Sequence, residues 1–158
     1  MKETLNIETE RVDDIPLLLA HMQHMNLAKL LDKHMPTHGN RKGLSLGNVV
    51  IVWLSHILSE GDHRMNHVQE WGKRRQETIR HCGFSTFEAG DLTDDRLADI
   101  LRALSDDAHW QAFEQELMGN LVRAYQLQKE CVRVDTTTVS SYAEVNEERF
   151  VQDIYKTF

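Results

Sequence analysis

The chain has 158 residues, 41% of them hydrophobic and 27% charged, which is enough for one soluble domain with a hydrophobic core. Its net charge of −7 argues against a protein that coats nucleic acid with its whole surface. The longest apolar run, Val49 to Leu54, is too short to span a bilayer, and no signal region precedes it. We therefore expect a cytoplasmic protein without membrane contact, whose two cysteines, Cys82 and Cys131, stay reduced.

The charge is distributed unevenly along the chain. Residues 36–82 contain seven Lys and Arg against four Asp and Glu, together with five of the nine histidines. Residues 83–130 contain four Lys and Arg against ten Asp and Glu. Any contact with a polyanion is therefore expected from the middle of the chain.

Two short helices are predicted near the N-terminus. The first starts at residues 13–16, where Asp can cap and Pro tolerates the first turn. Asn26 interrupts the helical pattern, and a second short helix ends before Pro36. Residues 38–43 then form an exposed loop rich in turn residues and cations.

The next helix is predicted to start after the cap Ser45 and to run to about Ser59. It is apolar almost all round, which is typical of a helix in the middle of a bundle. His56, on this helix, is interpreted as a hydrogen-bonded core histidine. Gly61 is expected to end the helix, and Asp62 to cap the following one.

Residues 62–80 predict one helix, or two helices broken near Gly72. Lys73 and Arg80 fall opposite its apolar side, and Arg74 lies on a flank. A glycine-punctuated loop follows, and then a short helix capped by Thr93. The longest helix is predicted from residue 105 or 106 to about residue 127, with Trp110, Phe113, Leu117, Leu121 and Tyr125 on one face.

Residues 131–141 are the one convincing strand, because they are rich in β-branched side chains. Asp135 lies in its middle and shares a face with Arg133. A short terminal helix is expected over residues 147–158. The predicted fold is thus mainly α: a bundle of five to seven helices with a single C-terminal strand.

Several stretches, taken in order, resemble one family. They are Gly43-Leu44-Ser45-Leu46-Gly47-Asn48, Ser59-Glu60-Gly61-Asp62-His63-Arg64-Met65, His67-Val68-Gln69-Glu70-Trp71, Leu92-Thr93-Asp94-Asp95-Arg96-Leu97 and Val134-Asp135-Thr136-Thr137-Thr138. Together they resemble the N-terminal part of a bacterial insertion-sequence transposase of the DDE class. In that class a helical domain precedes a ribonuclease-H-like core, which implies a helical DNA-binding or assembly domain over residues 1–128 and the start of the core over residues 129–158.

The resemblance implies that Asp135 is the first of three catalytic, metal-binding carboxylates. Cut-and-paste transposition displaces a DNA oxygen at phosphorus, and two divalent ions stabilise the attacking and leaving oxygens. Mg²⁺ is the expected cofactor because it prefers oxygen ligands. The alternative is an aspartate that is solvated or paired with Arg133.

The sequence departs from the family pattern after Asp135. Only 23 residues follow it, whereas a ribonuclease-H-like core needs about a hundred more. We hypothesise that a frameshift or internal stop cut the reading frame near Glu147, and we expect the chain alone to be inactive in strand transfer. Translating the downstream DNA in all three frames tests this hypothesis.

Cations of the middle region are the predicted contacts with DNA, the transposon terminal inverted repeats. The alternative is a solvated helix face. Alanines at Lys73, Arg74 and Arg80 are expected to weaken binding. The full predicted set is Arg41, Lys42, Arg64, Lys73, Arg74, Arg75 and Arg80.

Two other interpretations stay open. The acidic residues 83–130 suit protein contacts, so the chain could instead be an interaction module that joins full-length transposase in inactive mixed oligomers. It could also be a degenerate product without function. His63 and His67, at i and i+4, are interpreted as a surface pair, because no further metal-ligand spacing accompanies them.

Overall fold

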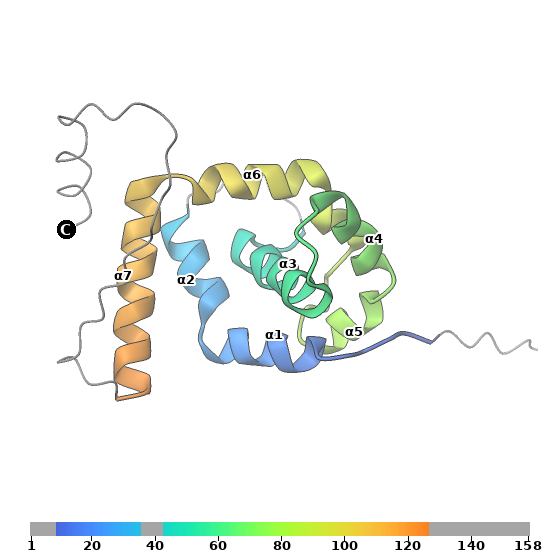
Figure 1. The fold of residues 1–158 in the computed structure, drawn as a ribbon, viewed down its shortest axis with the longest axis horizontal. Coiled ribbons are helices and arrows are strands. Elements are labelled where there is room, and N and C mark those ends of the chain that lie inside the picture. Colours follow the sequence, from blue (N-terminus) through green and yellow to red (C-terminus); the bar gives the residue numbers. More distant parts are fainter. Residues whose placement is uncertain (1–8, 36–42, 127–158) are drawn as a thin grey trace, which may run out of the picture. The chain divides into compact units, whose positions relative to one another are not determined.

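The computed structural model describes residues 9–35 and 43–126, and Figure 1 shows their arrangement. Within these ranges the chain is mainly α-helical, as predicted, with seven α-helices and no strand. The predicted strand at 131–141 and terminal helix at 147–158 lie outside the described residues. The elements are α1 (Ile15–His24), α2 (Leu27–His34), α3 (Leu46–Glu60), the 3-10 turn η1 (Met65–His67), α4 (Val68–Lys73), α5 (Gln76–His81), the 3-10 turn η2 (Ala89–Leu92), α6 (Asp94–Leu104) and α7 (Asp107–Ala124).

Helix α3 is the central element, and α1, α2, α4, α5 and α6 surround it in Figure 1. Ser45 caps it as predicted, because its side chain accepts a hydrogen bond from Asn48 N at 3.3 Å. Gly61 ends it in the left-handed conformation, with φ +62°. Val49 and Ile51 have no exposed surface, so the nearly all-round apolar pattern does correspond to a central core helix. None of the described helices combines the length and apolarity that crossing a membrane needs.

Helices α1 and α2 are separated at Asn26, as predicted, and this residue adopts a left-handed conformation with φ +54°. Asp14 stands at the N-cap of α1, but its side chain does not cap the helix. It accepts a hydrogen bond from Ser59 Oγ at 2.6 Å instead, which ties α1 to the end of α3. Helix α2 crosses α3 closely at Gly47, where an added Cβ would lie 2.0 Å from the carbonyl oxygen of Ala28.

The segment after α3 forms two helices broken near Gly72, which is the second of the two predicted arrangements. Helix α4 continues through Gly72 and ends at Lys73, and α5 begins after Arg75, which has φ −129°. Gly72 serves packing: a Cβ there would lie 2.6 Å from Leu92 Cδ1 and 3.1 Å from Phe87 Cζ. The glycine therefore lets the η2 segment approach α4, and the helix breaks two residues later.

An ion pair between η2 and α6 also holds Leu44, which lies two residues before α3, through hydrogen bonds. Asp91, whose side chain is only 3% exposed, pairs with Arg96, and Arg96 Nη2 also donates to the Leu44 carbonyl oxygen at 3.0 Å. The backbone nitrogens of Leu44 and Glu88 donate to the same carboxylate at 3.3 and 3.0 Å. Two stretches that are distant in the sequence are thus held together by one buried carboxylate.

Helix α7 begins after Asp106, whose side chain accepts from His109 N at 3.0 Å. Its apolar face is only partly buried, because α7 packs mainly against the one helix α2. Phe113 is buried, whereas Trp110 and Tyr125 are 41% and 57% exposed.

Candidate functional site

A cavity of about 900 Å³ lies between the N-terminal segment (residues 9–13), the C-terminal part of α3, the turn that follows it, and α4. Most of the residues that line it are polar or charged. Four carboxylates and four cationic side chains line it: Glu10, Arg11, Glu60, Asp62, Glu70, Lys73, Arg74 and Arg75. Trp71, His56, His67 and Asn66 complete most of the lining.

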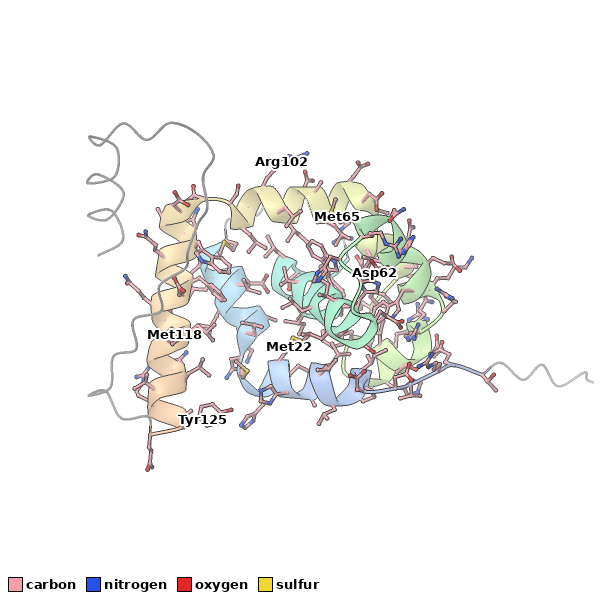
Figure 2. The ribbon with its side chains drawn as sticks, in the orientation of Figure 1. Met22, Asp62, Met65, Arg102, Met118 and Tyr125 are labelled. Carbon is pink, nitrogen blue, oxygen red and sulfur yellow. The ribbon has the colours of Figure 1, made fainter. Side chains whose placement is uncertain are left out.

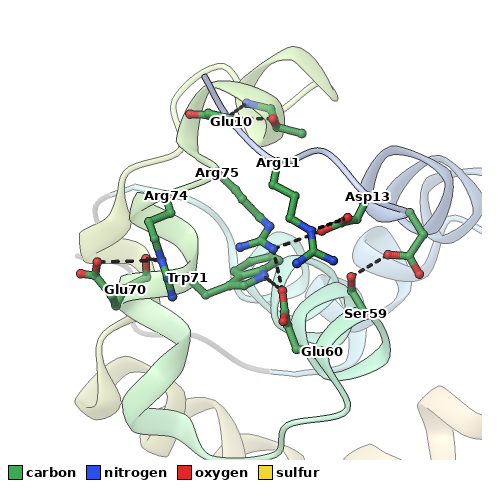
Figure 3. A network of polar contacts seen from close by, with 11 residues as sticks. Glu10, Arg11, Asp13, Ser59, Glu60, Glu70, Trp71, Arg74 and Arg75 are labelled. Atoms are coloured by element: carbon green, nitrogen blue, oxygen red, sulfur yellow. Dashed lines mark hydrogen bonds and ion pairs between the residues drawn. The ribbon is translucent and has the colours of Figure 1, made fainter. Parts of the chain in front are cut away.

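Arg75 organises one side of the cavity, as Figure 3 shows. The residue is only 6% exposed, and its Nη2 donates to Glu60 Oε1 at 2.6 Å and to Asp13 Oδ2 at 3.3 Å. Its guanidinium lies over the ring of Trp71, with 5.4 Å between Cζ and the ring centroid. The indole Nε1 of Trp71 donates to the same Glu60 oxygen at 3.2 Å. The end of α3, α4 and the N-terminal segment are thereby fixed around one buried cation.

The N-terminal segment is anchored by a second carboxylate. Glu10 accepts from Thr78 N and Thr78 Oγ1, both at 2.8 Å, and from Glu77 N at 3.0 Å. These donors belong to the first turn of α5, whose backbone N–H groups lack partners within the helix. Glu10 therefore holds residues 9–13 across the cavity edge (Figure 3).

His56 is buried at the cavity wall, with 2% exposure. Its ring meets Trp71 edge-on, with centroids 5.1 Å apart and an interplanar angle of 76°. The predicted burial is confirmed, but the predicted hydrogen bond is wrong: Nδ1 is enclosed without a partner, and no described residue bonds to the other ring nitrogen. Burial lowers the pKa of His56, so the ring is neutral at pH 7 and offers one unused donor and one unused acceptor.

Asp62 does not cap the next helix, contrary to the prediction. Its carboxylate accepts from Arg64 Nε, Nη2 and backbone N, all at 3.0 Å, and its Oδ2 lies 2.8 Å from His67 Nδ1. The reason is that the chain turns directly after Gly61, so Asp62 closes a local turn ahead of η1. The bonds from Arg64 are the main cause that holds the pKa of Asp62 far below its usual range.

This pKa shift predicts a pH dependence of stability. Because the folded-state pKa is depressed, the stabilisation is present above the unfolded aspartate pKa of about 3.9 and is lost as pH falls through the folded-state value. The Asp62→Asn variant should melt below the wild type above about pH 5, and this gap should close on acidification. Thermal melts from pH 7 to 2 check this. The control is Glu114→Gln, which removes an exposed acid of α7 that makes no ion pair with any described residue, and it should show no such gap.

The cations predicted to contact DNA are not equivalent in the structure. Arg64 and Arg74 have side chains 69% and 66% exposed; Arg74 has only a distant carboxylate, Glu70, at 3.9 Å. Lys73 is exposed and makes no ion pair with any described residue. Three of the predicted cations therefore lie at the surface near the cavity.

Two others are held inside the protein's own contacts. Arg75 is buried in the network described above, and Arg80 donates to the Phe87 carbonyl oxygen at 3.0 Å and pairs with Glu77 and Glu88, each at 2.8 Å. Both stabilise the fold, because they connect α5 to neighbouring segments. Arg41, Lys42 and Asp135 lie outside the described residues.

The described part of the chain contains no group of three or more His, Cys, Asp or Glu side chains arranged to hold a metal ion. His63 and His67 are both exposed, as expected for a pair of surface histidines, and His67 lies against Asp62. Cys82 is a free thiol, and burial raises its pKa. The Mg²⁺ prediction rests on Asp135 and stays a prediction.

The described fold is therefore an all-α domain with a polar cavity beside its central helix. Residues 7–118 match the family described as a domain of unknown function, DUF4277, and the chain belongs to this family. The family is commonly found in transposase-like proteins. No curated protein and no solved structure matches the chain.

Proposed function

We propose that the chain is the helical N-terminal domain of a transposase-like protein and that it binds the DNA ends of the mobile element. The observation that carries this proposal is the family match over residues 7–118, in a family common in transposase-like proteins. In this proposal the protein is of the DDE class, and Asp135 supplies its first Mg²⁺-binding carboxylate.

The DNA contact is assigned to Arg64, Lys73 and Arg74. Arg64 directly precedes η1, Lys73 is the last residue of α4 and Arg74 follows it. All three side chains are exposed, and none of them makes a buried ion pair. Arg75 and Arg80 are left out of the contact, because their side chains are only 7% and 27% exposed and each is bonded to more than one segment. Arg64 pairs with Asp62, but its side chain is 69% exposed, and such an exposed pair holds it only weakly. Exposed cations can instead replace the counterions of the DNA backbone.

The test replaces Arg64, Lys73 and Arg74 with alanine together and measures binding to a duplex with the element's terminal inverted repeat. We expect affinity to fall by roughly 10- to 100-fold at low salt, with the slope of log K against log salt smaller by about three. Fluorescence anisotropy over a salt series measures both quantities. The matched control is Lys29→Ala, Arg102→Ala and Arg123→Ala, which removes the same charge from other helices.

Equal weakening in both triple variants would mean that only net charge matters and would contradict the assigned surface. Unchanged binding in the first variant would place the contact elsewhere. Circular dichroism of both variants should show the helical signal of the wild type, which excludes unfolding as the cause of weaker binding.

A second candidate is the interaction module that joins intact transposase in mixed oligomers. The observation that favours it is the surface of α7: of its eighteen residues only Phe113 is buried, while Trp110 and Met118 are 41% and 50% exposed. Apolar exposure of this kind marks protein contacts more often than DNA contacts. If this candidate holds, the anisotropy assay shows no specific DNA binding, and light scattering shows a complex with intact transposase.

A further inference from the structure

The cavity has more unused hydrogen-bond donors than acceptors. Its carboxylates are mostly occupied: Glu10 by α5, Glu60 by Arg75 and Trp71, and Asp62 by Arg64 and His67. The fourth, Glu70, has an exposed side chain that is free to turn away into solvent.

The donors of the same wall are less satisfied. Lys73 has no partner among the described residues, and Arg74 has one weak bond, from Nε to the Glu70 carbonyl oxygen at 3.4 Å. Nε of Arg75 and Nδ1 of His56 have no acceptor but are fully enclosed, which leaves Nε2 of His56 as the ring nitrogen that can face a ligand in the cavity. A donor without an acceptor is stabilised by a ligand that brings acceptor oxygens to it, and Lys73, Arg74 and His56 supply such donors on this wall.

We propose that this cavity binds a phosphate group through Lys73, Arg74 and the ring N–H of His56. Tetrahedral phosphate presents several acceptor oxygens and negative charge, which match two cations and a neutral donor. A metal cation does not fit, because the carboxylates are already bonded and form no ligand group in the described residues. An apolar ligand fits less well than an anion, because eight of the lining residues carry a charge.

The natural source of the phosphate is assigned to the DNA backbone, and in this respect the inference rests on the proposed function. Lys73 and Arg74 belong to both the outer surface and the cavity wall, so a duplex held by the surface cations can place one phosphate at the cavity mouth. His56 lies only in the cavity, and Arg64 does not line it. These two residues therefore separate the cavity from the general DNA contact.

The experiment titrates the full chain with inorganic pyrophosphate at constant ionic strength and follows it by ¹H–¹⁵N NMR. We expect saturable shifts of the Trp71 indole N–H and of backbone signals of residues 66–75. The dissociation constant should rise by about tenfold or more in Lys73→Ala and in His56→Phe, because each loses a donor to the anion. The matched control is Lys29→Ala on α2, which removes an exposed lysine that pairs with no described residue, and it should bind like the wild type.

Absence of saturable shifts, or equal weakening by Lys29→Ala and Lys73→Ala, would overturn the cavity proposal. If His56→Phe does not fold, Lys73→Ala still tests the proposal, because Lys73 is exposed and its loss should not disturb the core. Weaker duplex binding by His56→Phe would support the DNA backbone as the source. If the chain binds pyrophosphate but His56→Phe does not change duplex binding, the DNA backbone is not the source of the phosphate. The cavity would then bind free phosphate compounds.

The two proposals fail in different ways. Arg64→Ala should weaken duplex binding more than it changes pyrophosphate binding, because Arg64 lies on the outer surface and does not line the cavity. A chain that binds pyrophosphate but no duplex contradicts the proposed function alone, whereas a chain that binds the duplex without any cavity shifts contradicts the further inference alone.

Discussion

Replacing Arg96 with methionine is expected to lower the free energy of unfolding by about 3–5 kcal/mol, which corresponds to a melting temperature lower by on the order of 10 °C. Methionine keeps much of the side-chain length but removes the charge that faces Asp91. That carboxylate is 3% exposed, so it cannot regain solvation without movement of the surrounding segments. The bond from Arg96 to the Leu44 carbonyl oxygen is lost as well.

Urea unfolding followed by circular dichroism measures this effect. The control is Arg102→Met on the same helix, whose ion pair with Asp99 joins side chains 74% and 53% exposed, and whose loss should cost little. Adding Asp91→Asn to the Arg96→Met variant should restore part of the stability, because it removes the uncompensated buried charge. Similar stability of the two methionine variants would show that the Asp91 pair is not a strong link in the fold.

The second large effect is expected for Gly47→Ala, at the crossing of α2 and α3. The added methyl group would lie 2.0 Å from the Ala28 carbonyl oxygen and 2.7 Å from its carbonyl carbon. Both atoms belong to a helix backbone that cannot move without disturbing buried contacts of α2, so we expect a loss of about 3 kcal/mol. Gly47 N also donates to Asp32 Oδ1 at 2.7 Å, and separation of the helices would weaken this bond.

Gly119→Ala is the matched control, because Gly119 lies within α7 and a Cβ there meets no atom within 4 Å. That substitution should stabilise the helix by up to about 1 kcal/mol, through helix propensity alone. Opposite signs of the two changes in thermal melts are the expected result. A neutral Gly47→Ala variant would mean that α2 and α3 separate easily at this point.

The start and end of most helices could be predicted because their signals are local. Ser45 caps α3, Gly61 ends it and Asn26 separates α1 from α2, each through its own backbone conformation or a partner within a few residues. The core of α3 could also be predicted, since an apolar surface on all sides requires cover on all sides. The helix break near Gly72 was also predicted, but the packing role of this glycine was not, because a glycine that breaks a helix and a glycine that admits a close neighbour have the same sequence pattern.

The candidate site was only partly predictable. Its exposed cations, Lys73 and Arg74, were singled out by charge and helical position. Their neighbour Arg75 belongs to the same run of three cations, but it is turned inward to partners 15 and 62 residues away. The missing partner of His56 could not be foreseen either, because hydrogen bonding of a buried ring depends on every element that surrounds it.

The sequence by itself determined the helical class, the position of the central helix and the concentration of cations in residues 36–82. Only the tertiary structure decided which of those cations are free, and that Glu10, His56, Trp71 and Lys73 meet at one cavity. The physical reason is one of range: caps and periodicity act over a few residues, whereas ion pairing and burial depend on contacts between segments far apart in the chain.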